Sequence, residues 1–246
     1  MKAMIFAAGL GTRLKPITDT LPKALVPVGG SPLIEHVARK LKASGVEEAV
    51  VNVHHFADKI EEWVARQDIM SIKVSDEKKE LLETGGGILN ARQYLDGCGR
   101  FLIHNVDILS DVDIEWFERS FPEDAMAALL VSERETSRYL LFDPHSMRLV
   151  GWTNVKTGEV RSPYADLNPE QCVRMAFSGI HIMSDKVFDV MEEYSENPRF
   201  PIIDFYLSIC AEHKIYGVPA KELHMIDVGK LDSLQQAESM AKSLDL

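Results

Sequence analysis

The sequence predicts an α/β fold, with a Rossmann-like mixed, mostly parallel sheet flanked by helices. Short apolar runs, typical of strands buried on both faces, recur near residues 2–7, 48–53, 71–75, 100–105, 125–131, 140–143, 174–183 and 215–219. Segments with helical spacing of apolar residues fill the gaps between these runs. Such an alternation is typical of a sheet that carries helices on both faces.

Four helices are expected between the strands. The first has Ser31 as its N-cap and Pro32 in its first turn, continues with an apolar stripe to Leu41 and ends at Gly45. The others cover residues 58–66, about 86–95 and 231–244.

The chain has 246 residues, 46% of them hydrophobic, and is therefore large enough to bury one extensive core. No repeat, low-complexity tract or linker divides it, so we expect one domain over residues 1–246. Residues 142–173 interrupt the alternation with prolines, glycines and polar residues. We expect this stretch to form short antiparallel strands and loops inserted near the working edge of the sheet, where ligand contacts in such folds are usually made.

Charge and cysteine content narrow the function and the location. Acidic residues outnumber basic ones by 38 to 27, and the net charge of -11 lacks the clustered Lys and Arg of nucleic-acid binders, so nucleic acid is not an expected partner. Cys98, Cys172 and Cys210 lie far apart, which favours reduced thiols and a cytoplasmic location. The apolar stretch over residues 1–8 is too short for a signal peptide or a membrane span, so no membrane is expected as a partner.

The most informative segment covers residues 6–33 and reads FAAGLGTRLKPITDTLPKALVPVGGSPL. Arg13 and Lys23 supply a planar fork and a point charge, which are two ways of neutralising phosphate oxygens. A plain glycine turn would explain the glycines alone, but not these cations and the prolines among them. Small residues after the first strand allow backbone N–H groups to approach a ligand closely: Ala7, Ala8, Gly9 and Gly11.

This segment is neither a Walker phosphate loop, since no Gly-Lys-Ser/Thr opens a helix, nor a complete three-glycine dinucleotide fingerprint. It resembles the signature of the sugar-1-phosphate nucleotidyltransferases, and the resemblance extends from Met1 to about Ala237. The resemblance implies the nucleotide-diphospho-sugar transferase fold. It also implies transfer of a nucleoside monophosphate from a nucleoside triphosphate to a sugar 1-phosphate, with release of pyrophosphate and with Mg²⁺ as cofactor. The oligomeric state stays open.

The resemblance also assigns roles in nucleotide binding. Arg13 would bind the departing β- and γ-phosphates, and Lys23 would hold the α-phosphate where attack occurs. The nucleotide would lie against the loop after the first strand, made of Ala7, Ala8, Gly9, Gly11 and Thr12. A later turn reads the nucleobase in this family, and here it contains Glu77, Thr84, Gly85 and Gly86. For Glu77 a flexible, solvated loop is the alternative.

Two carboxylates are expected to hold the magnesium ion, which prefers oxygen ligands and usually keeps several waters. Asp107 ends an apolar strand, and Asp227 begins an Asp-Val-Gly element; both resemble metal-binding positions of the family. Either residue alone could be a helix cap or a turn residue, which is the role expected for Asp111 and Asp113. Their combination with the N-terminal segment favours the metal site.

The sugar phosphate is expected beside the insertion. Asn154 and Lys156 stand where many relatives carry Glu-x-Lys-Pro. The neutral Asn154 spares an acidic sugar the repulsion of a Glu, and Lys156 offers a cation, with a solvated hairpin lysine as the alternative. Ser178 and Gly179 resemble a sugar-binding strand of the family without its Asn, and Asn105 is expected near the same pocket.

Two short stretches indicate the substrates. LLETGGGI over residues 81–88 and FSGIHI over residues 177–182 look most like the N-acetylmuramate-1-phosphate uridylyltransferases. We therefore expect UTP and N-acetylmuramate 1-phosphate, with guanylyl transfer to mannose 1-phosphate or a heptose 1-phosphate as the alternative. A non-catalytic nucleotide-sugar sensor is the alternative from another class, and the presence of both cations and both carboxylates argues against it.

Overall fold

A computed structural model describes residues 1–194 and 196–243 of the chain. The strands are β1 (Lys2–Phe6), β2 (Pro27–Val28), β3 (Ser31–Pro32), β4 (Glu48–Val53), β5 (Ser71–Asp76), β6 (Arg100–Asn105), β7 (Ile108–Ser110), β8 (Ala127–Ser132), β9 (Arg138–Phe142), β10 (Leu149–Asn154), β11 (Glu159–Arg161), β12 (Val173–Ser184), β13 (Ile215–Pro219) and β14 (Met225–Asp227). The helices are α1 (Leu33–Ala43), α2 (Ala57–Arg66), α3 (Glu83–Asn90), α4 (Arg92–Leu95), α5 (Ile114–Arg119), α6 (Val187–Tyr194), α7 (Ile202–Ile209) and α8 (Leu231–Ser243).

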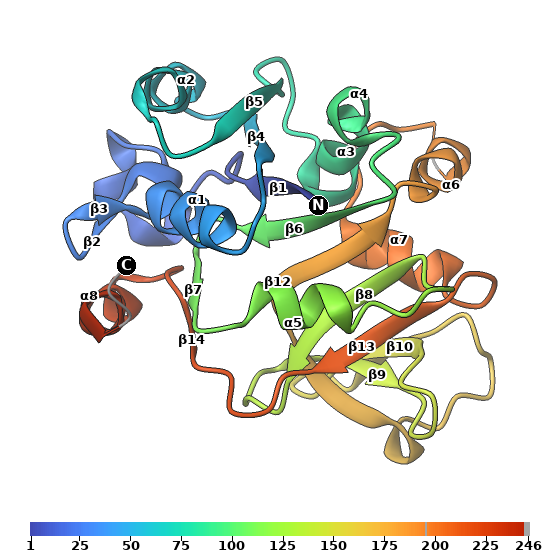
Figure 1. Cartoon of the computed structure of the whole chain (residues 1–246). Coiled ribbons are helices and arrows are strands. Elements are labelled where there is room, and N and C mark those ends of the chain that lie inside the picture. The colour runs from blue at the N-terminus through green and yellow to red at the C-terminus, as the bar shows by residue number, and fades with distance from the viewer. Residues whose placement is uncertain (195, 244–246) are drawn as a thin grey trace.

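A mixed sheet forms the centre of the fold (Figure 1). Its main path runs in the order β11, β10, β9, β12, β6, β1, β4 and β5, and β8 and β13 pair beside β12. Strands β5, β4, β1 and β6 are parallel, as are β8 and β13, whereas β12 runs antiparallel to its partners β6, β8 and β9. The expected α/β fold, with a mixed sheet and parallel strands at its centre, is confirmed.

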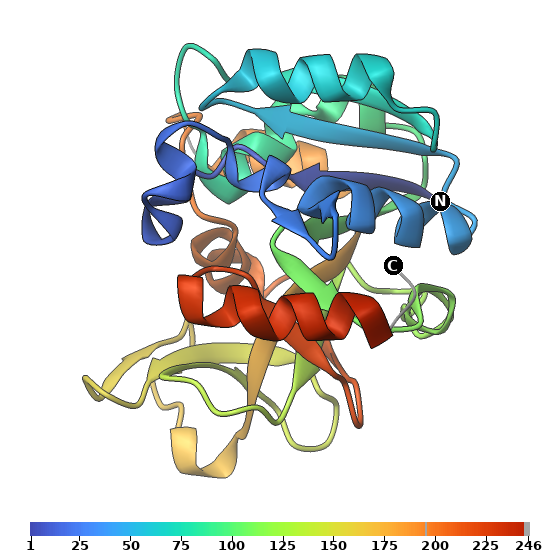
Figure 2. The same ribbon diagram turned by 90° about the vertical axis from the view of Figure 1, so that its left-hand side faces the viewer.

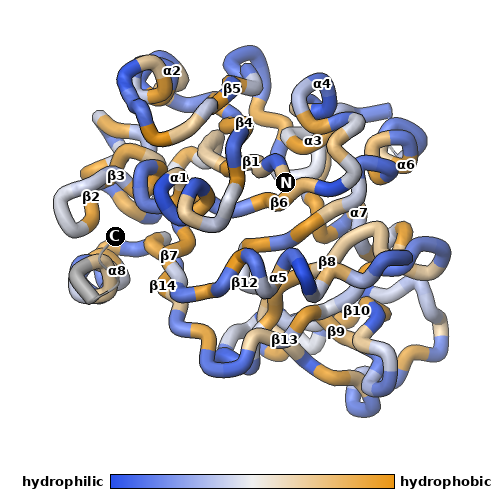
Figure 3. Tube along the Cα trace, in the orientation of Figure 1, coloured by the Kyte–Doolittle hydropathy of each residue, from blue (hydrophilic) through white to orange (hydrophobic). Residues whose placement is uncertain are grey.

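Helices cover both faces of this sheet (Figures 1 and 2). Helices α1, α2, α5 and α8 pack on the face presented by Ala3 and Ile5 of β1, and α3, α4, α6 and α7 pack on the face presented by Met4. Successive residues of a strand point to opposite faces, so one apolar strand supplies both cores. Strand β6 is hydrophobic in its middle, where its sequence reads FLI, and polar at both ends (Figure 3). No helix in the described part of the chain is long and apolar enough to cross a bilayer.

Strand β12 joins two parts of the sheet. Residues 180–184 pair with β6, and residues 173–175 pair with β9 beyond the carboxyl end of β6. The register against β8 shifts between Phe177 and His181, and Gly179 in this irregularity has a φ of +74°. A bulge of this kind bends a strand and increases its twist. Beyond this bulge, β12 pairs with β9, and the antiparallel strands β9, β10 and β11 lie past the edge at which the parallel strands end.

The start of α1 differs from the prediction. Ser31, the expected N-cap, belongs to β3, which pairs with β2, and the helix begins at Leu33 with Pro32 as its N-cap residue. Pro32 pairs with Pro27 and is itself extended, with a ψ of 150°, so it cannot be the first helical residue, and the prediction of Ser31 as N-cap is wrong. The end of the helix agrees with the prediction, since Gly45 has a φ of +76°, the left-handed conformation that stops helices.

Other helical regions also depart from the prediction, among them α5, for which the sequence predicts no helix. The helix expected over residues 86–95 is divided into α3 and α4, and α3 begins at Glu83. The sequence predicts no helix over residues 187–194 or 202–209, where α6 and α7 form. The run IIDFYLSI in α7 is apolar throughout, and such a run is compatible with a buried helix or a buried strand. Residue 244, the expected end of the last helix, lies outside the described residues.

Candidate functional site

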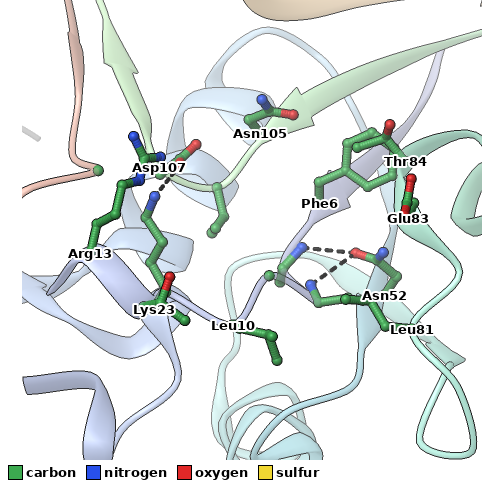
Figure 4. Close-up of a pocket in the computed structure, with 17 residues that line it drawn as sticks. Phe6, Leu10, Arg13, Lys23, Asn52, Leu81, Glu83, Thr84, Asn105 and Asp107 are labelled. Atoms are coloured by element: carbon green, nitrogen blue, oxygen red, sulfur yellow. Dashed lines mark hydrogen bonds and ion pairs between the residues drawn. The ribbon is translucent and has the colours of Figure 1, made fainter. Parts of the chain in front are cut away.

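A cavity of about 530 Å³ opens at the carboxyl ends of β1, β4 and β6 (Figure 4). In α/β sheets this edge is where ligands bind, because the loops that follow parallel strands meet there. The lining comes from the loop after β1, the ends of β4 and β6, the region where α3 begins and the turn before α8: Phe6, Ala7, Ala8, Gly9, Leu10, Gly11, Thr12, Arg13, Lys23, Asn52, Leu81, Glu83, Thr84, Asn105, Val106, Asp107 and Gly229.

The cavity brings together part of the predicted site. Predicted residues in its lining are Ala7, Ala8, Gly9, Gly11, Thr12, Arg13, Lys23, Thr84, Asn105 and Asp107. Predicted residues outside its lining are Glu77, Gly85, Gly86, Asn154, Lys156, Ser178, Gly179 and Asp227.

Asn52 fixes the backbone at one end of the cavity. Its side chain is buried, and its Oδ1 accepts hydrogen bonds from the backbone N–H of Ala7 at 2.8 Å and of Ala8 at 3.4 Å (Figure 4). These two N–H groups are therefore directed at Asn52 and not at a ligand. The expectation that they approach the ligand is corrected accordingly: Ala7 and Ala8 offer a small, rigid surface on which a flat group can lie.

Glu77 supports Asn52 from behind the cavity wall. Its side chain is only 2% exposed, and its Oε1 accepts from Asn52 Nδ2 at 2.8 Å while its Oε2 accepts from the Leu82 N–H at 3.1 Å. Burial raises the pKa of the Glu77 carboxyl, and the hydrogen bonds from Asn52 and Leu82 oppose that rise. The structure thus places Glu77 as a support for Asn52, away from the edge of a nucleobase and away from solvent.

The glycines of α3 serve packing. The N–H groups of Gly85 and Gly86 donate to the carbonyl of Phe200 at 2.8 and 3.2 Å. A Cβ on Gly86 would lie 1.9 Å from the carbonyl oxygen of Pro198, and one on Gly85 would lie 2.3 Å from the ring of Phe200. Only glycine lets α3 lie this close to the segment before α7. Thr84 lines the cavity itself, and its Oγ1 accepts from the first N–H of α7 at 2.9 Å.

A left-handed turn leads the chain to the other end of the cavity. Gly11 has a φ of +63°, and a Cβ there would lie 2.9 Å from the side chain of Thr18. The Thr18 hydroxyl donates to the carbonyl of Gly11 at 2.8 Å and closes the turn. Thr12 and Arg13 follow directly, so the turn brings the Arg13 side chain to the cavity.

Two cations and two carboxylates gather at that end. Lys23 Nζ forms an ion pair with Asp107 Oδ2, and both side chains are largely shielded from solvent (Figure 4). Arg13 and Asp227 approach each other at Gly229, where a Cβ would lie 3.0 Å from Arg13 Nη2 and 2.7 Å from Asp227 Oδ1. The glycine leaves room for both side chains.

Asp107 and Asp227 come together because β14 pairs with β7. Asp227 opposes Ile108 in this pairing, and the N–H of Val228 donates to the carbonyl of Asp107 at 2.8 Å. Partial desolvation raises the pKa of the Asp227 carboxyl, and the negative charge of Asp107 raises it further. Neighbouring cations lower it again: Lys23, Arg13 and Arg134.

These two carboxylates fit a hard divalent cation that also binds substrate. In residues 1–194 and 196–243, no group of three or more His, Cys, Asp or Glu side chains could hold a metal ion. Mg²⁺ usually takes one or two carboxylates and completes its shell with waters and substrate phosphates. The mutual repulsion of Asp107 and Asp227 favours a cation between them.

Of the residues predicted to bind the sugar phosphate, only Asn105 lies in the cavity lining. Asn105 lines the cavity, and Gly179 packs against it, because a Cβ at 179 would lie 2.8 Å from Asn105 Nδ2. Ser178 is buried, and its Oγ has no hydrogen-bond partner among the residues that the structure describes. Asn154 and Lys156 lie at the turn between β10 and β11, where Asn154 Oδ1 accepts from the Lys156 N–H at 3.1 Å. The structure does not bring this turn into the cavity lining.

Seven residues of the cavity lining were not predicted, and two of them have polar side chains, Asn52 and Glu83. The sequence did mark Asn52, because it is the one amide in the apolar run AVVNV of β4, close to the end of the strand where ligands bind. Glu83 lines the cavity with a φ of +62° and pairs through its Oε1 with Arg199 Nε at 3.0 Å. Nothing in the local pattern marks Glu83, because its partner lies far along the chain.

Sequence comparison relates the chain to enzymes that transfer nucleotidyl groups. The profile of the nucleotidyl transferase family matches residues 2–147. The N-acetylmuramate alpha-1-phosphate uridylyltransferase of Caulobacter vibrioides is 33% identical over 232 residues, which are 91% of this chain and 90% of that protein. A probable mannose-1-phosphate guanylyltransferase of Arabidopsis thaliana is 36% identical over 128 residues, which are 47% of this chain and 34% of that protein.

A solved structure shares the fold over nearly the whole chain. The putative glucose-1-phosphate thymidylyltransferase of Bacillus anthracis, solved in complex with sucrose, superposes with a TM-score of 0.80 and 22% sequence identity. The match covers 98% of this chain and 95% of that chain.

Proposed function

The chain belongs to the nucleotidyl transferase family, and on that premise we propose which substrates it takes and how its residues act on them. Its class is that of the sugar-1-phosphate nucleotidyltransferases. We propose that it transfers a uridylyl group from UTP to N-acetylmuramate 1-phosphate with the help of Mg²⁺. This mechanism is supported by one observation: the cations Arg13 and Lys23 lie together with the carboxylates of Asp107 and Asp227 at one end of the cavity.

Local charge has to drive this reaction. Two polyanions meet when a sugar phosphate approaches a triphosphate, so catalysis depends on neutralising charge and on aligning the reactants. The net charge of -11 opposes such an encounter. The side chains of Arg13 and Lys23 supply the positive charge where the reaction needs it.

The residues divide the work along the cavity. The nucleobase and ribose lie against Ala7, Ala8 and Gly9 on one side and Thr84 on the other. Lys23 moves from Asp107 to an oxygen of the α-phosphate, while Arg13 holds the β- and γ-phosphates. An oxygen of the sugar phosphate attacks the α-phosphorus, and the bond from that phosphorus to the bridging oxygen of the β-phosphate breaks. Pyrophosphate leaves with the electron pair of this bond, and Arg13 stabilises its charge.

Asp107 and Asp227 would hold the magnesium ion. When bound, the ion neutralises phosphate charge and orients the phosphates for in-line attack. The ion pair between Lys23 and Asp107 keeps both side chains in place until the substrates arrive.

The resemblance over the whole chain supports the choice of substrates. The uridylyltransferase of Caulobacter vibrioides covers 91% of the chain, whereas the guanylyltransferase of Arabidopsis thaliana covers 47%. The sugar would lie beside Asn105, Ser178 and Gly179, with the turn at Asn154 further out. A neutral residue at position 154 suits the extra carboxylate of N-acetylmuramate.

Pyrophosphate release tests the proposal. The purified chain with Mg²⁺ is offered UTP, GTP or dTTP, each with N-acetylmuramate 1-phosphate, N-acetylglucosamine 1-phosphate or mannose 1-phosphate. We expect the highest kcat/KM with UTP and N-acetylmuramate 1-phosphate. Preference for GTP and mannose 1-phosphate would instead assign the guanylyltransferase activity, and a lack of turnover with every pair would indicate a sensor.

We also propose a cytoplasmic location and a single domain over residues 1–246. The cysteines Cys98, Cys172 and Cys210 are all free thiols, which suits a reducing compartment.

A further inference from the structure

Arg134 is a third cation at the working edge of the sheet. It follows β8, and β8 and β6 both run antiparallel to β12, so the carboxyl ends of β6 and β8 point the same way. Arg134 therefore leaves the sheet at the same edge as Asp107, which follows β6. The loops at this edge form the ligand site of an α/β sheet.

The guanidinium of Arg134 is held on the bulge of β12. Its Nη2 donates to the carbonyl of Phe177 at 2.9 Å. Phe177 directly precedes Ser178 and Gly179, and the bulge at Gly179 packs against Asn105 in the cavity lining. Arg134 is thus fixed beside the region proposed for the sugar.

No ion pair among the described residues neutralises the charge of Arg134. In this half of the chain Arg161 pairs with Asp204 at 2.8 Å and Arg174 pairs with Glu170, whereas Arg138 and Arg148, like Arg134, form no ion pair within residues 1–194 and 196–243. In the part of the chain that the structure describes, no carboxylate lies within ion-pair distance of the exposed Arg134 side chain. The positive charge of Arg134 nevertheless lowers the pKa of the Asp227 carboxyl. An anchored, exposed and uncompensated arginine next to a proposed phosphate-transfer centre is suited to an anionic ligand.

We propose that Arg134 binds the phosphate of the incoming sugar 1-phosphate. This inference rests on the proposed function, because it names the group that receives its second substrate. A guanidinium presents parallel N–H donors that match two oxygens of a phosphate, and Arg134 retains free donors beside the one given to Phe177. A phosphate held there lies on the Asp227 side of the site, next to the carboxylates around which the nucleotide phosphates gather.

Lys156 is the competing candidate. It is exposed at the turn between β10 and β11, and its backbone N–H is bonded to Asn154. A lysine on a hairpin turn loses more conformational freedom on binding than an arginine that is already anchored to the sheet. Arg134 is also the one of the two whose charge acts on Asp227.

Four variants of the full chain test the inference. Arg134→Gln removes the charge but keeps an amide that can donate to Phe177, and Arg134→Lys keeps the charge. Lys156→Gln tests the competing residue. Arg119→Gln makes the same change of net charge at the end of α5, on a helix that contributes nothing to the cavity lining. KM for each substrate, kcat and Tm are measured for all four.

We expect Arg134→Gln to raise KM for N-acetylmuramate 1-phosphate by about 10- to 100-fold. KM for UTP and Tm should stay near the wild-type values, and Arg134→Lys should recover much of the loss. Lys156→Gln and Arg119→Gln should behave as wild type. Inorganic phosphate should compete with the sugar phosphate less well in Arg134→Gln than in the wild type.

Other outcomes overturn the inference in distinguishable ways. An active wild type with an unchanged acceptor KM in Arg134→Gln leaves the proposed function standing and removes this role of Arg134. A loss confined to Lys156→Gln moves the phosphate to the hairpin. A lowered Tm with equal changes in both KM values gives Arg134 a structural role. A wild type without turnover on any acceptor overturns the proposed function, and the inference falls with it.

Discussion

Lys23 and Asp107 form an ion pair that ties the loop after β1 to the end of β6, at one end of the cavity. Lys23 is buried, so its charge needs a partner, and Asp107 supplies one in the protein without ligands. A nucleotide and a divalent cation can replace both halves of this pair, the phosphate for Asp107 and the cation for Lys23. The pair therefore keeps the site assembled in the form that its substrates need.

Asp107→Asn should abolish turnover while the chain still folds, because the amide keeps the shape of the side chain but loses its charge. Tm should fall, since the buried Lys23 loses its partner. Losing a metal ligand removes several kcal/mol of transition-state stabilisation, so pyrophosphate release should fall at least about a hundredfold. Circular dichroism checks the fold. Wild-type turnover in this variant, or in the wild type with excess chelator, would contradict the assignment of the metal site.

Lys23→Ala should lower kcat more than it weakens binding of UTP, because Lys23 is proposed to act at the reacting phosphorus. Arg13→Ala should lower kcat and weaken binding together, since Arg13 holds phosphates in both the ground state and the transition state. Steady-state kinetics and direct titration with UTP separate the two effects. If Lys23→Ala changed only KM for UTP, the proposed position of Lys23 would be wrong.

Gly9→Ala and Gly86→Ala should give opposite results for the same chemical change. Gly9 lines the cavity, and a Cβ there meets nothing within 4 Å, so the variant should keep its Tm and bind UTP more weakly. A Cβ at Gly86 meets the Pro198 carbonyl at 1.9 Å, and overpacking of this kind should lower Tm by at least about 4 °C. Scanning calorimetry and UTP titration are the measurements. A stable Gly86→Ala variant would refute the packing role of Gly86.

Glu77→Gln should weaken UTP binding without any contact between Glu77 and the nucleotide. The amide can accept only one of the two hydrogen bonds that Glu77 accepts from Asn52 and Leu82, and an unsatisfied buried group costs about 1 to 3 kcal/mol. Tm should fall, and KM for UTP should rise. Glu80→Gln, an exposed change in the same loop, is the control, and equal effects in both variants would sink this explanation.

Acid should destabilise the protein through His104 and His181. Burial lowers the pKa of His104 to about 4 and that of His181 to about 3, from an ordinary value of 6.5. The folded state keeps both rings neutral while the unfolded chain takes up protons below pH 6.5, so their contribution is complete above that pH and is lost as the pH falls.

The expected slope is up to about 1.4 kcal/mol per pH unit for each histidine in the window below pH 6. Urea unfolding of the wild type and of His181→Gln at pH 7, 6 and 5 measures it. The variant should show a shallower decline of the unfolding free energy than the wild type. Identical slopes would exclude His181 as a source of the acid sensitivity.

The strands were predictable because their signal is local. Parallel strands buried on both faces need continuous apolar runs, and β1, β4 and β6 have them. The N-cap of α1 was not predictable from Ser31, because the pairing of β3 with β2 overrides the local preference of serine. The same limit applies to α7, where the tertiary packing decides between helix and strand.

In the site, the predicted residues of the loop after β1 line the cavity together, because one continuous segment carries them. It predicts Gly85 and Gly86 as neighbours of a ligand, but their requirement for glycine comes from Phe200 and Pro198, far along the chain. A glycine in the sequence indicates that something lies close to the backbone, but not whether it is a ligand or another part of the protein. Arg134 carries no motif, and only the pairing of β8 with β12 places it at the same edge of the sheet as Asp107.

The path of β12 keeps the catalytic end of the cavity apart from the hairpins formed by β9, β10 and β11. Its second half is locked against β6 in the central sheet, while its first half carries the β9 to β11 hairpins outside it. Residues 143–172 contribute nothing to the cavity lining, and they contact other parts of the protein, β13 through the Gly217 N–H and the Met147 carbonyl at 2.9 Å and α7 through the ion pair of Arg161 with Asp204. Sequence changes confined to this segment should therefore leave the catalytic centre unchanged, and chimeras joined at β9 and β12 would measure whether the segment influences the choice of sugar.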